Sequence, residues 1–448
     1  MVAVNNQKPK FMKKIMMLSF AAFSLAGYAQ TPTTTPAAPA AKDWDVSLYG
    51  FVRTDYIWDT RKSAQVRELN LNLYPLDESK LADGSDQNAV GQSNFLSVVS
   101  RLGVKVKGPD VWGAKVAGTL EGDFFGNTEP ASNTVTNLDG TKTTINQSSS
   151  IGMFRLRHAY ATLDWSKTQL TFGQTWYPTF IPECFPGVAN FSTGILFNPF
   201  GWASQVKLKQ NFTKEFSFAL TAYKDREFAA TNPGTQNSAS INSALPTLHG
   251  QFQYKNQHWL FGLGAEYRSL KPLTVSNGKM SDETLNTSSV VGFLKYSNDK
   301  IIVKAYGISG KDMSNLVMVG GFAGYTANTT EPEKYEGLKT TSGWIDIASN
   351  GKKVAPGMFF GYTKNGGTGV DGATAFYARG VSSTRSIDNV WRVSGRVDFK
   401  SNKFRISPEL EYTAATWGDN TTAKNGTADN NQVKISNFRT MVSCVYAF

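Results

Sequence analysis

The sequence of 448 residues has only two cysteines and three histidines, and it has no apolar run of the length that a membrane-spanning helix needs. It also lacks a G-x-S-x-G elbow, an H-E-x-x-H pair and any closely spaced cysteine pair. These absences remove the usual signatures of serine hydrolases, zinc peptidases and structural zinc sites. We therefore expect a protein that is not an enzyme and that holds no metal and no cofactor.

The end of the chain shows a regular alternation of side chains. Phe438, Thr440, Val442, Cys444, Tyr446 and Phe448 fall on one face, and the residues between them fall on the other. Period-two alternation over about ten residues is what a tilted membrane-spanning strand needs. A last strand that ends on Phe resembles the end of a bacterial outer-membrane β-barrel.

The start of the chain has the organisation of an export signal. Residues 13–14 are lysines, residues 15–25 are largely apolar, and small residues follow at Gly27 and Ala29. This order predicts a secretory signal peptide over residues 1–29, which is cleaved on export. Residues 30–44 lack apolar periodicity and predict a flexible lead-in, so the predicted barrel covers residues 45–448.

Between these ends, alternating stretches come in pairs joined by very short links. Asn298-Asp299, Asn350-Gly351 and Ser401-Asn402 are examples of such links, and they are typical of β-hairpins. Seven short turns alternate with eight long polar segments, at about 59–94, 126–150, 178–201, 225–246, 269–287, 310–339, 363–387 and 418–431. The pattern predicts an all-β fold, a transmembrane antiparallel barrel of about sixteen strands with short periplasmic turns and long outer loops. An even number of strands closes such a barrel without a free edge.

The phase of each strand separates a lipid face from a lumen face. In residues 100–108, Leu102, Val104 and Val106 share one face, and three basic residues share the other. A Lys or Arg at the bilayer midplane costs roughly 2 to 4 kcal/mol, so the basic face must point inward. The same argument predicts a basic pore lining, most uniform and with few acids in phase between residues 101 and 209. Its members are Arg53, Arg101, Lys105, Lys107, Lys115, Arg155, Arg157, Lys207, Lys209, Arg392, Arg396, Arg405 and Arg439.

Several segments resemble the Gram-negative trimeric general porins, in particular the DcaP-like group. SRLGVKVKGPDVWGAKVAGTLEGDF (100–124) is similar to the second hairpin of that family, and FRLRHAYATLDW (154–165) with TFGQTW (171–176) to the next. The following segment, 178–201, matches a third loop that folds inward, and the resemblance implies a constriction there with Pro178, Glu183, Phe185, Phe191 and Phe197. Family members often present acidic residues in this loop, whereas Glu183 is its only acid here. A preference for cations is therefore not carried over.

These observations predict a porin in the cell outer membrane: a water-filled channel for passive diffusion of small hydrophilic, anionic solutes. The expected partners are outer-membrane lipid, lipopolysaccharide and, by resemblance, two further copies in a homotrimer. Nucleic acid is not expected, although the chain after residue 29 carries about +7, from 42 basic and 35 acidic residues. Two alternatives stay open. The basic residues could form salt bridges that brace the wall, and the chain could be a surface binding or adhesion protein that displays long loops on a plugged barrel.

Overall fold

The computed structural model describes residues 44–66, 68–126, 131–136, 142–147, 152–225, 231–234, 237–328 and 330–448. The predicted signal peptide and all of the predicted lead-in except its last residue lie outside this part of the chain. Strands dominate it, beside a short α2 helix (Ser238–Asn242) and one turn of 3-10 helix (Ser314–Leu316). No described helix has both the length and the apolar character needed to cross a membrane.

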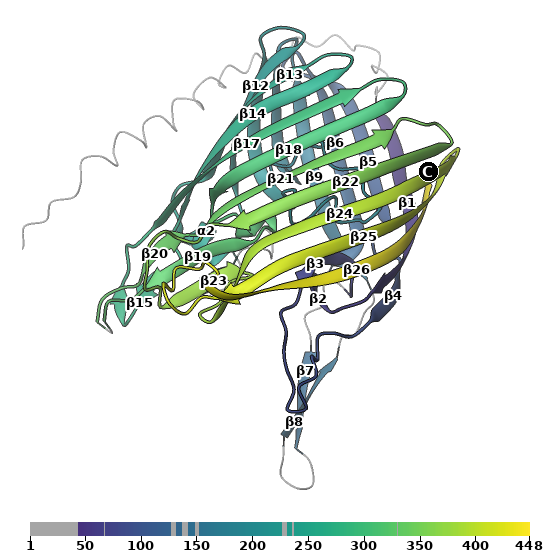
Figure 1. Ribbon diagram of the computed structural model, residues 1–448. Helices are drawn as coiled ribbons and strands as arrows, with labels where there is room; N and C mark the ends of the chain where they lie inside the picture. Colours follow the sequence, from purple (N-terminus) through teal and green to yellow (C-terminus); the bar gives the residue numbers. More distant parts are fainter. Residues whose placement is uncertain are drawn as a thin grey trace, which may run out of the picture. The chain divides into compact units, whose positions relative to one another are not determined.

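In the described chain, sixteen strands close into an antiparallel barrel (Figure 1). They are β1 (Asp45–Asp59), β5 (Arg101–Val111), β6 (Ala114–Gly126), β9 (Met153–Asp164), β10 (Thr168–Trp176), β11 (Trp202–Asn211), β12 (Phe216–Lys224), β13 (Thr247–Lys255), β14 (Trp259–Leu270), β17 (Leu285–Ser297), β18 (Ile301–Lys311), β21 (Lys339–Ser349), β22 (Val354–Asn365), β24 (Arg385–Ser401), β25 (Phe404–Asp419) and β26 (Asn430–Ala447). Closure comes from β26, which pairs with β1 from Phe51↔Ala447 to Asp59↔Arg439. The predicted fold class and strand number are thereby confirmed.

One further strand, β4 (Gln92–Leu96), joins the barrel sheet and was not predicted. It pairs with the last part of β1, from Asp55↔Leu96 to Asp59↔Gln92, whereas β5 pairs only with the first part of β1. Without β4 the last five residues of β1 would present an unpaired edge on that side, which lipid does not tolerate.

Alternation along the strands sorts side chains into an outer apolar face and an inner polar face. Leu263 and Met358 are 71% and 65% exposed on the outside, whereas Arg392 and Glu411 are almost completely buried inside. This is the arrangement of a barrel whose outer surface meets lipid. The hydrophobic residues that the sequence pattern assigned to the lipid face, such as Leu102 and Leu120, are indeed exposed.

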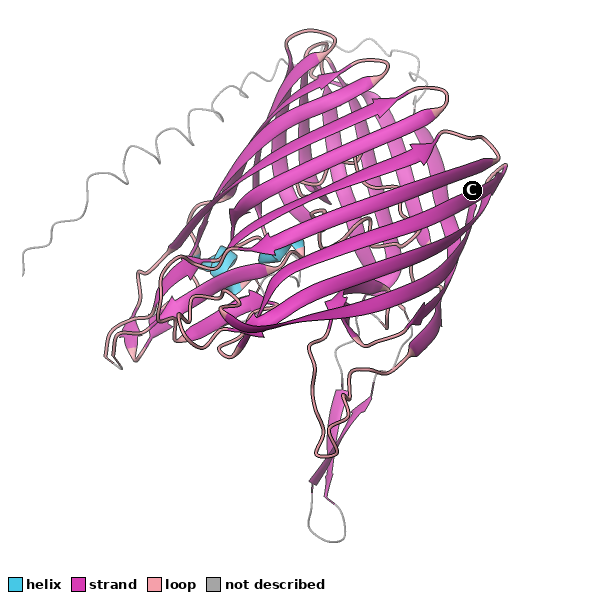
Figure 2. Cartoon of the chain, viewed as in Figure 1, coloured by secondary structure: helices cyan, strands magenta, loops and turns pink. Residues whose placement is uncertain are grey.

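The long loops contain secondary structure of their own, as the strands drawn in magenta outside the barrel wall show (Figure 2). Three of these loops hold the hairpins β2 (Ser63–Val66) with β3 (Leu71–Pro75), β7 (Ala131–Thr136) with β8 (Lys142–Gln147), and β15 (Val275–Ser276) with β16 (Lys279–Met280). Two further loops contribute to one small sheet, made of β19 (Gly320–Tyr325), β20 (Lys334–Gly337) and β23 (Ala375–Arg379). The sequence predicted only polar loops here, because these strands are short and their composition is rich in Gly, Asn and Thr.

Candidate functional site

The third long loop, residues 177–201 between β10 and β11, folds into the lumen and reaches its far wall. Arg53 of β1 donates to the carbonyl oxygen of Ala189 at 2.6 Å, and the amide of Ala189 donates to Glu409 of β25 at 2.8 Å. Farther along the loop, Arg392 of β24 donates to the carbonyl oxygen of Ile195 at 2.9 Å. The order of the strands places β24 and β25 on the far side of the barrel from β11, and β1 a quarter of the way round from β10. The predicted inward fold of this loop is confirmed.

Three aromatic residues predicted for the constriction hold loop 3 against the wall. The ring of Phe197 lies 6.1 Å from that of Phe359 on β22, and the ring of Phe191 lies 5.3 Å from that of Phe125 on β6. Phe197 is fully buried and Phe191 nearly so. Phe185 takes part through its backbone, since its carbonyl oxygen accepts a hydrogen bond from Lys304 at 2.8 Å.

The other two predicted constriction residues border a cavity of about 260 Å³ between loop 3 and the short turns. Pro178 and Glu183 line it together with Trp176 at the end of β10. Glu183, about half exposed, forms an ion pair with Lys255 at 2.6 Å. The only acid of the loop is therefore compensated by a partner that is equally exposed.

Loop 1 (about residues 59–94) and loop 6 (about residues 310–339) also enter the barrel. This inward course was not predicted from the sequence. Leu71 and Leu73 of β3 and Met318 and Val319 of the sixth loop are at most 4% exposed and belong to the same apolar cluster as Phe200 of loop 3. Two short signals in the sequence point to this burial: the alternating leucines of residues 69–73 and the apolar run of residues 316–319. Both lie within segments whose overall polarity favours an exposed loop.

Several of the predicted basic residues are paired with acids on β6. Arg155 contacts Asp123 at 2.8 Å, and Arg157 contacts both Glu121 at 2.9 Å and Asp123 at 3.1 Å. Arg101 approaches Glu121 at 3.4 Å. The expectation that few acids oppose this part of the wall is wrong here, because antiparallel pairing of β6 with β5 and β9 brings both carboxylates beside the three guanidinium groups.

A second group of predicted residues is paired in the same way around the rest of the lumen. The pairs are Arg53–Asp55 at 2.8 Å, Arg392–Glu411 at 3.3 Å, Arg396–Asp346 at 2.8 Å and Arg439–Asp59 at 2.7 Å. Each partner is nearly inaccessible to solvent. Removing a single member of such a pair leaves an uncompensated buried charge, so these residues brace the wall.

The remaining predicted residues lie toward the short turns and keep their charge uncompensated or weakly compensated. Lys105, Lys207, Lys209 and Arg405 form no ion pair with any residue in the described part of the chain. Two others pair only at exposed positions, Lys107 with Asp45 at 3.1 Å and Lys115 with Asp110 at 2.8 Å. Exposed ion pairs of this kind contribute little to the free energy of folding.

Lys207 and Lys209, two residues apart on β11, both point into the 260 Å³ cavity. On the same stretch of wall, two strands away, β13 lines the cavity with Gln251 and Gln253. Trp176 closes one end, with its ring stacked at 4.1 Å on Phe180 of loop 3. Two ammonium groups beside amides and an aromatic surface form a setting that attracts small anions.

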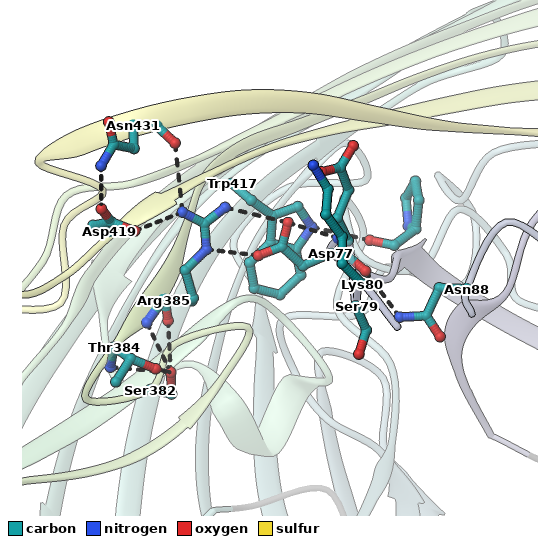
Figure 3. A network of polar contacts seen from close by, with 12 residues as sticks. Asp77, Ser79, Lys80, Asn88, Ser382, Thr384, Arg385, Trp417, Asp419 and Asn431 are labelled. Atoms are coloured by element: carbon teal, nitrogen blue, oxygen red, sulfur yellow. Dashed lines mark hydrogen bonds and ion pairs between the residues drawn. The ribbon is translucent and has the colours of Figure 1, made fainter. Parts of the chain in front are cut away.

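At the loop end of the barrel, Arg385 ties loop 1 to the wall (Figure 3). Its guanidinium donates to Asp77 of loop 1 at 2.7 Å and to Asp419 at the end of β25, also at 2.7 Å. Farther along loop 1, Asp86 contacts Arg61 at 2.6 Å. Partial burial raises the pKa of Asp86, but hydrogen bonds from backbone amides and the Arg61 guanidinium outweigh this, so the pKa lies below its usual value.

No protein-family model matches the chain, and no curated protein matches it in sequence. Its fold, however, matches solved structures of outer-membrane proteins. The channel DcaP of Acinetobacter baumannii is 18% identical with a TM-score of 0.63, covering 90% of this chain and 97% of DcaP. The anion-selective porin from Comamonas acidovorans is 14% identical with a TM-score of 0.52, covering 91% and 100%. OmpT of Vibrio cholerae is 11% identical with a TM-score of 0.50, covering 90% and 98%.

These likenesses agree with the closed barrel of the described chain. The protein thus has the fold of Gram-negative outer-membrane porins, as the resemblance of its second and third hairpins predicted.

Proposed function

We propose that the protein is an outer-membrane porin that lets small hydrophilic, anionic solutes diffuse through its lumen. The observation that carries the proposal is the pair Lys207 and Lys209, which face a cavity beneath an inward-folded loop inside a closed barrel. In this setting the short turns face the periplasm and the long loops face the medium, as in barrels of this kind. A cleaved signal peptide over residues 1–29 would deliver the chain to this membrane.

The preference for anions follows from which charges remain uncompensated. The three arginines beside Glu121 and Asp123 all contact these acids, so most of their charge is compensated within the group. Lys105, Lys207 and Lys209 have no such acid, so they set the sign of the potential along the solute path. The solved anion-selective porin with this fold supports the proposal only through the shared architecture.

The proposal also covers the oligomeric state and the lipid around the barrel. We infer a homotrimer embedded in outer-membrane lipid and lipopolysaccharide, by resemblance to the trimeric porins. The broad apolar band on the outer face, with residues such as Leu263 and Met358, supports contact with lipid around the barrel.

A second function has one specific observation in its favour. Loops 1, 3 and 6 meet in an apolar cluster inside the barrel, where Met318, Val319 and Phe197 are fully buried. If this cluster seals the lumen, the barrel serves as a mount that displays its long loops for binding or adhesion. Conduction instead requires a water path beside the cluster.

Single-channel recording in a planar bilayer separates the two functions. The purified full-length protein, shown to be folded by its heat-modifiable mobility on a gel, is added to one side in KCl. The porin predicts stepwise, roughly ohmic current increments that recur with a uniform size. A folded protein that inserts without any current steps would reject the porin and support the plugged barrel.

A further inference from the structure

The outer surface of the barrel carries an apolar groove that the transport function does not use. It has a volume of about 640 Å³ and lies across β18, β21, β22 and β24 at the end nearest the short turns. Ile345, Ile347, Met358 and Phe360 line it with outward side chains, and Lys300 borders it at the turn. The groove is long, open to the outside and lined almost wholly by hydrocarbon, so its chemistry suits an acyl chain.

The turns beside this groove are unusually basic. Three neighbouring turns, residues 298–300, 350–353 and 402–403, contain Lys300, Lys352, Lys353 and Lys403 against a single acid, Asp299. None of these four ammonium groups pairs with an acid among the residues that the structure describes. All four lysines are exposed.

Backbone hydrogen bonds hold these turns together in space. The amide of Asn350 donates to the carbonyl oxygen of Lys300 at 2.8 Å, and the amide of Lys400 donates to that of Lys353 at 2.8 Å. The lysines therefore form one rim at the mouth of the groove. Two other short turns are balanced: Asp110 pairs with Lys115 at 2.8 Å, and Glu215 lies next to Lys214.

We propose that the groove and its lysine rim form a binding site for an anionic phospholipid of the leaflet at the short-turn end. An acyl chain lies along Ile347, Met358 and Phe360, and the phosphate of the headgroup is held by Lys300, Lys352 and Lys353. Lysines at this depth keep their ammonium groups in the headgroup region, where each attracts anionic lipid. The site rests on the proposed membrane setting, but not on conduction.

A second copy of the chain is a poorer occupant of the groove. The rim carries four lysines and one acid, and the short-turn end of another copy carries the same lysines. Pressing two such ends together would bring like charges close without a compensating anion. An anionic lipid supplies both the apolar chain for the groove and the negative charge for its rim.

The test measures lipid retained by the full-length protein in native mass spectrometry, with phosphatidylglycerol or phosphatidylcholine of identical chains added to the detergent. The wild type should retain phosphatidylglycerol at least roughly fivefold more than phosphatidylcholine. The variant K300Q/K352Q/K353Q should lose this preference. A matched control, K334Q/K339Q/K424Q, removes three exposed lysines at the opposite end of the barrel and should keep it. Filling the groove with Ser349→Trp should lower retention of both lipids.

Three results would overturn the site: a wild type without preference, a preference that survives in K300Q/K352Q/K353Q, and unchanged retention in Ser349→Trp. A change of oligomeric mass in the groove variants would instead assign the groove to contact between copies, which also rejects the proposal. Current steps recorded on the same preparations keep the two proposals apart. If the wild type conducts but does not prefer phosphatidylglycerol, only the lipid site is rejected. If the protein is folded and prefers phosphatidylglycerol but does not conduct, only the channel is rejected.

Discussion

The two halves of the lumen handle charge in opposite ways. In the loop-side half, between loop 3 and the long loops, Arg155 and Arg157 are held by Asp123 and Glu121 at 2.8 to 3.1 Å and are largely shut off from water. In the short-turn half, Lys207 and Lys209 line a cavity and form no ion pair with any described residue, and the one acid of this cavity, Glu183, pairs with Lys255. Both halves have basic walls by sequence, but among the described residues only the short-turn half keeps predicted lysines without an ion pair.

The position of a basic residue on the lumen face therefore does not define its role. A guanidinium that is buried with its carboxylate fixes the loops and strands in place. An ammonium group that is left unpaired beside water biases which ions enter.

The largest effect is expected for Arg157→Gln in the loop-side half. The substitution removes a buried guanidinium that contacts both Glu121 and Asp123, although other arginines still face these acids, so we expect the free energy of unfolding to fall by about 2 to 3 kcal/mol. Unfolding by guanidinium chloride of the protein reconstituted in lipid, followed by tryptophan fluorescence, measures it. Lys209→Gln, two strands away and unpaired, is the matched control and should change stability by less than about 0.5 kcal/mol.

A double variant tests whether Arg157 acts through its contact with the acids. The losses caused by Arg157→Gln and Glu121→Gln should not add up in the double variant, because both substitutions remove the same contact at 2.9 Å. Equal stability losses for Arg157→Gln and Lys209→Gln would erase the distinction between the two halves.

A thiol reports whether loop 3 stays folded across the lumen. Cys184 is buried, and its Sγ donates to the carbonyl oxygen of Leu294 at 3.3 Å. Burial raises the pKa of Cys184 to about 11, so little thiolate is present at pH 8. In a Cys444→Ser background we expect a charged thiol reagent to modify Cys184 at least roughly tenfold more slowly than the unfolded chain. Rapid modification would show that loop 3 leaves the wall. The lumen would then no longer be divided by this loop into two halves.

A smaller effect is expected where loop 1 meets the wall. Replacing Asp77 by Ala removes the partly exposed contact with Arg385, worth about 1 kcal/mol, and should speed proteolytic cleavage of loop 1 without unfolding the barrel. Glu78→Ala is the control, since the Glu78 carboxylate pairs with the exposed Lys80 at 3.6 Å and with no arginine of the described wall. Cleavage that is equally fast in both variants would mean that Arg385 does not hold the loop.

The smallest effect is expected for the pH dependence of loop 1. Because the folded-state pKa of Asp86 lies below its usual value of about 4, its contribution to stability is complete above that pH and is lost as the pH falls through the depressed folded-state value. Cleavage of loop 1 by an acid-active protease should therefore accelerate more steeply below about pH 4 in the wild type than in Asp86→Asn. Parallel pH profiles would contradict a role for Asp86 in fixing the loop.

The sequence reveals the faces of the strands far better than the partners across them. Alternation assigned Arg155 to the inner face, because a two-residue period is visible in FRLR. Its pairing with Asp123 depends on the register between β6 and β9, which includes bulges that no local pattern indicates. Loop 3 was identifiable by its Pro, Phe and Gly content, whereas the inward course of loops 1 and 6 rests on short apolar pieces within polar segments. Contacts between loops far apart in the chain, such as Phe200 with Leu316, are set by tertiary packing alone.

The most direct measurement of the division between the two halves is the reversal potential across a planar bilayer under a KCl gradient. The wild type should prefer chloride at low salt and approach neutrality at high salt, because the Debye length falls from about 30 Å at 0.01 M to about 3 Å at 1 M. K207Q/K209Q should lose much of this preference at low salt while keeping its conductance steps. A potassium preference in the wild type, or a preference unchanged in K207Q/K209Q, would contradict the assignment of selectivity to the short-turn half.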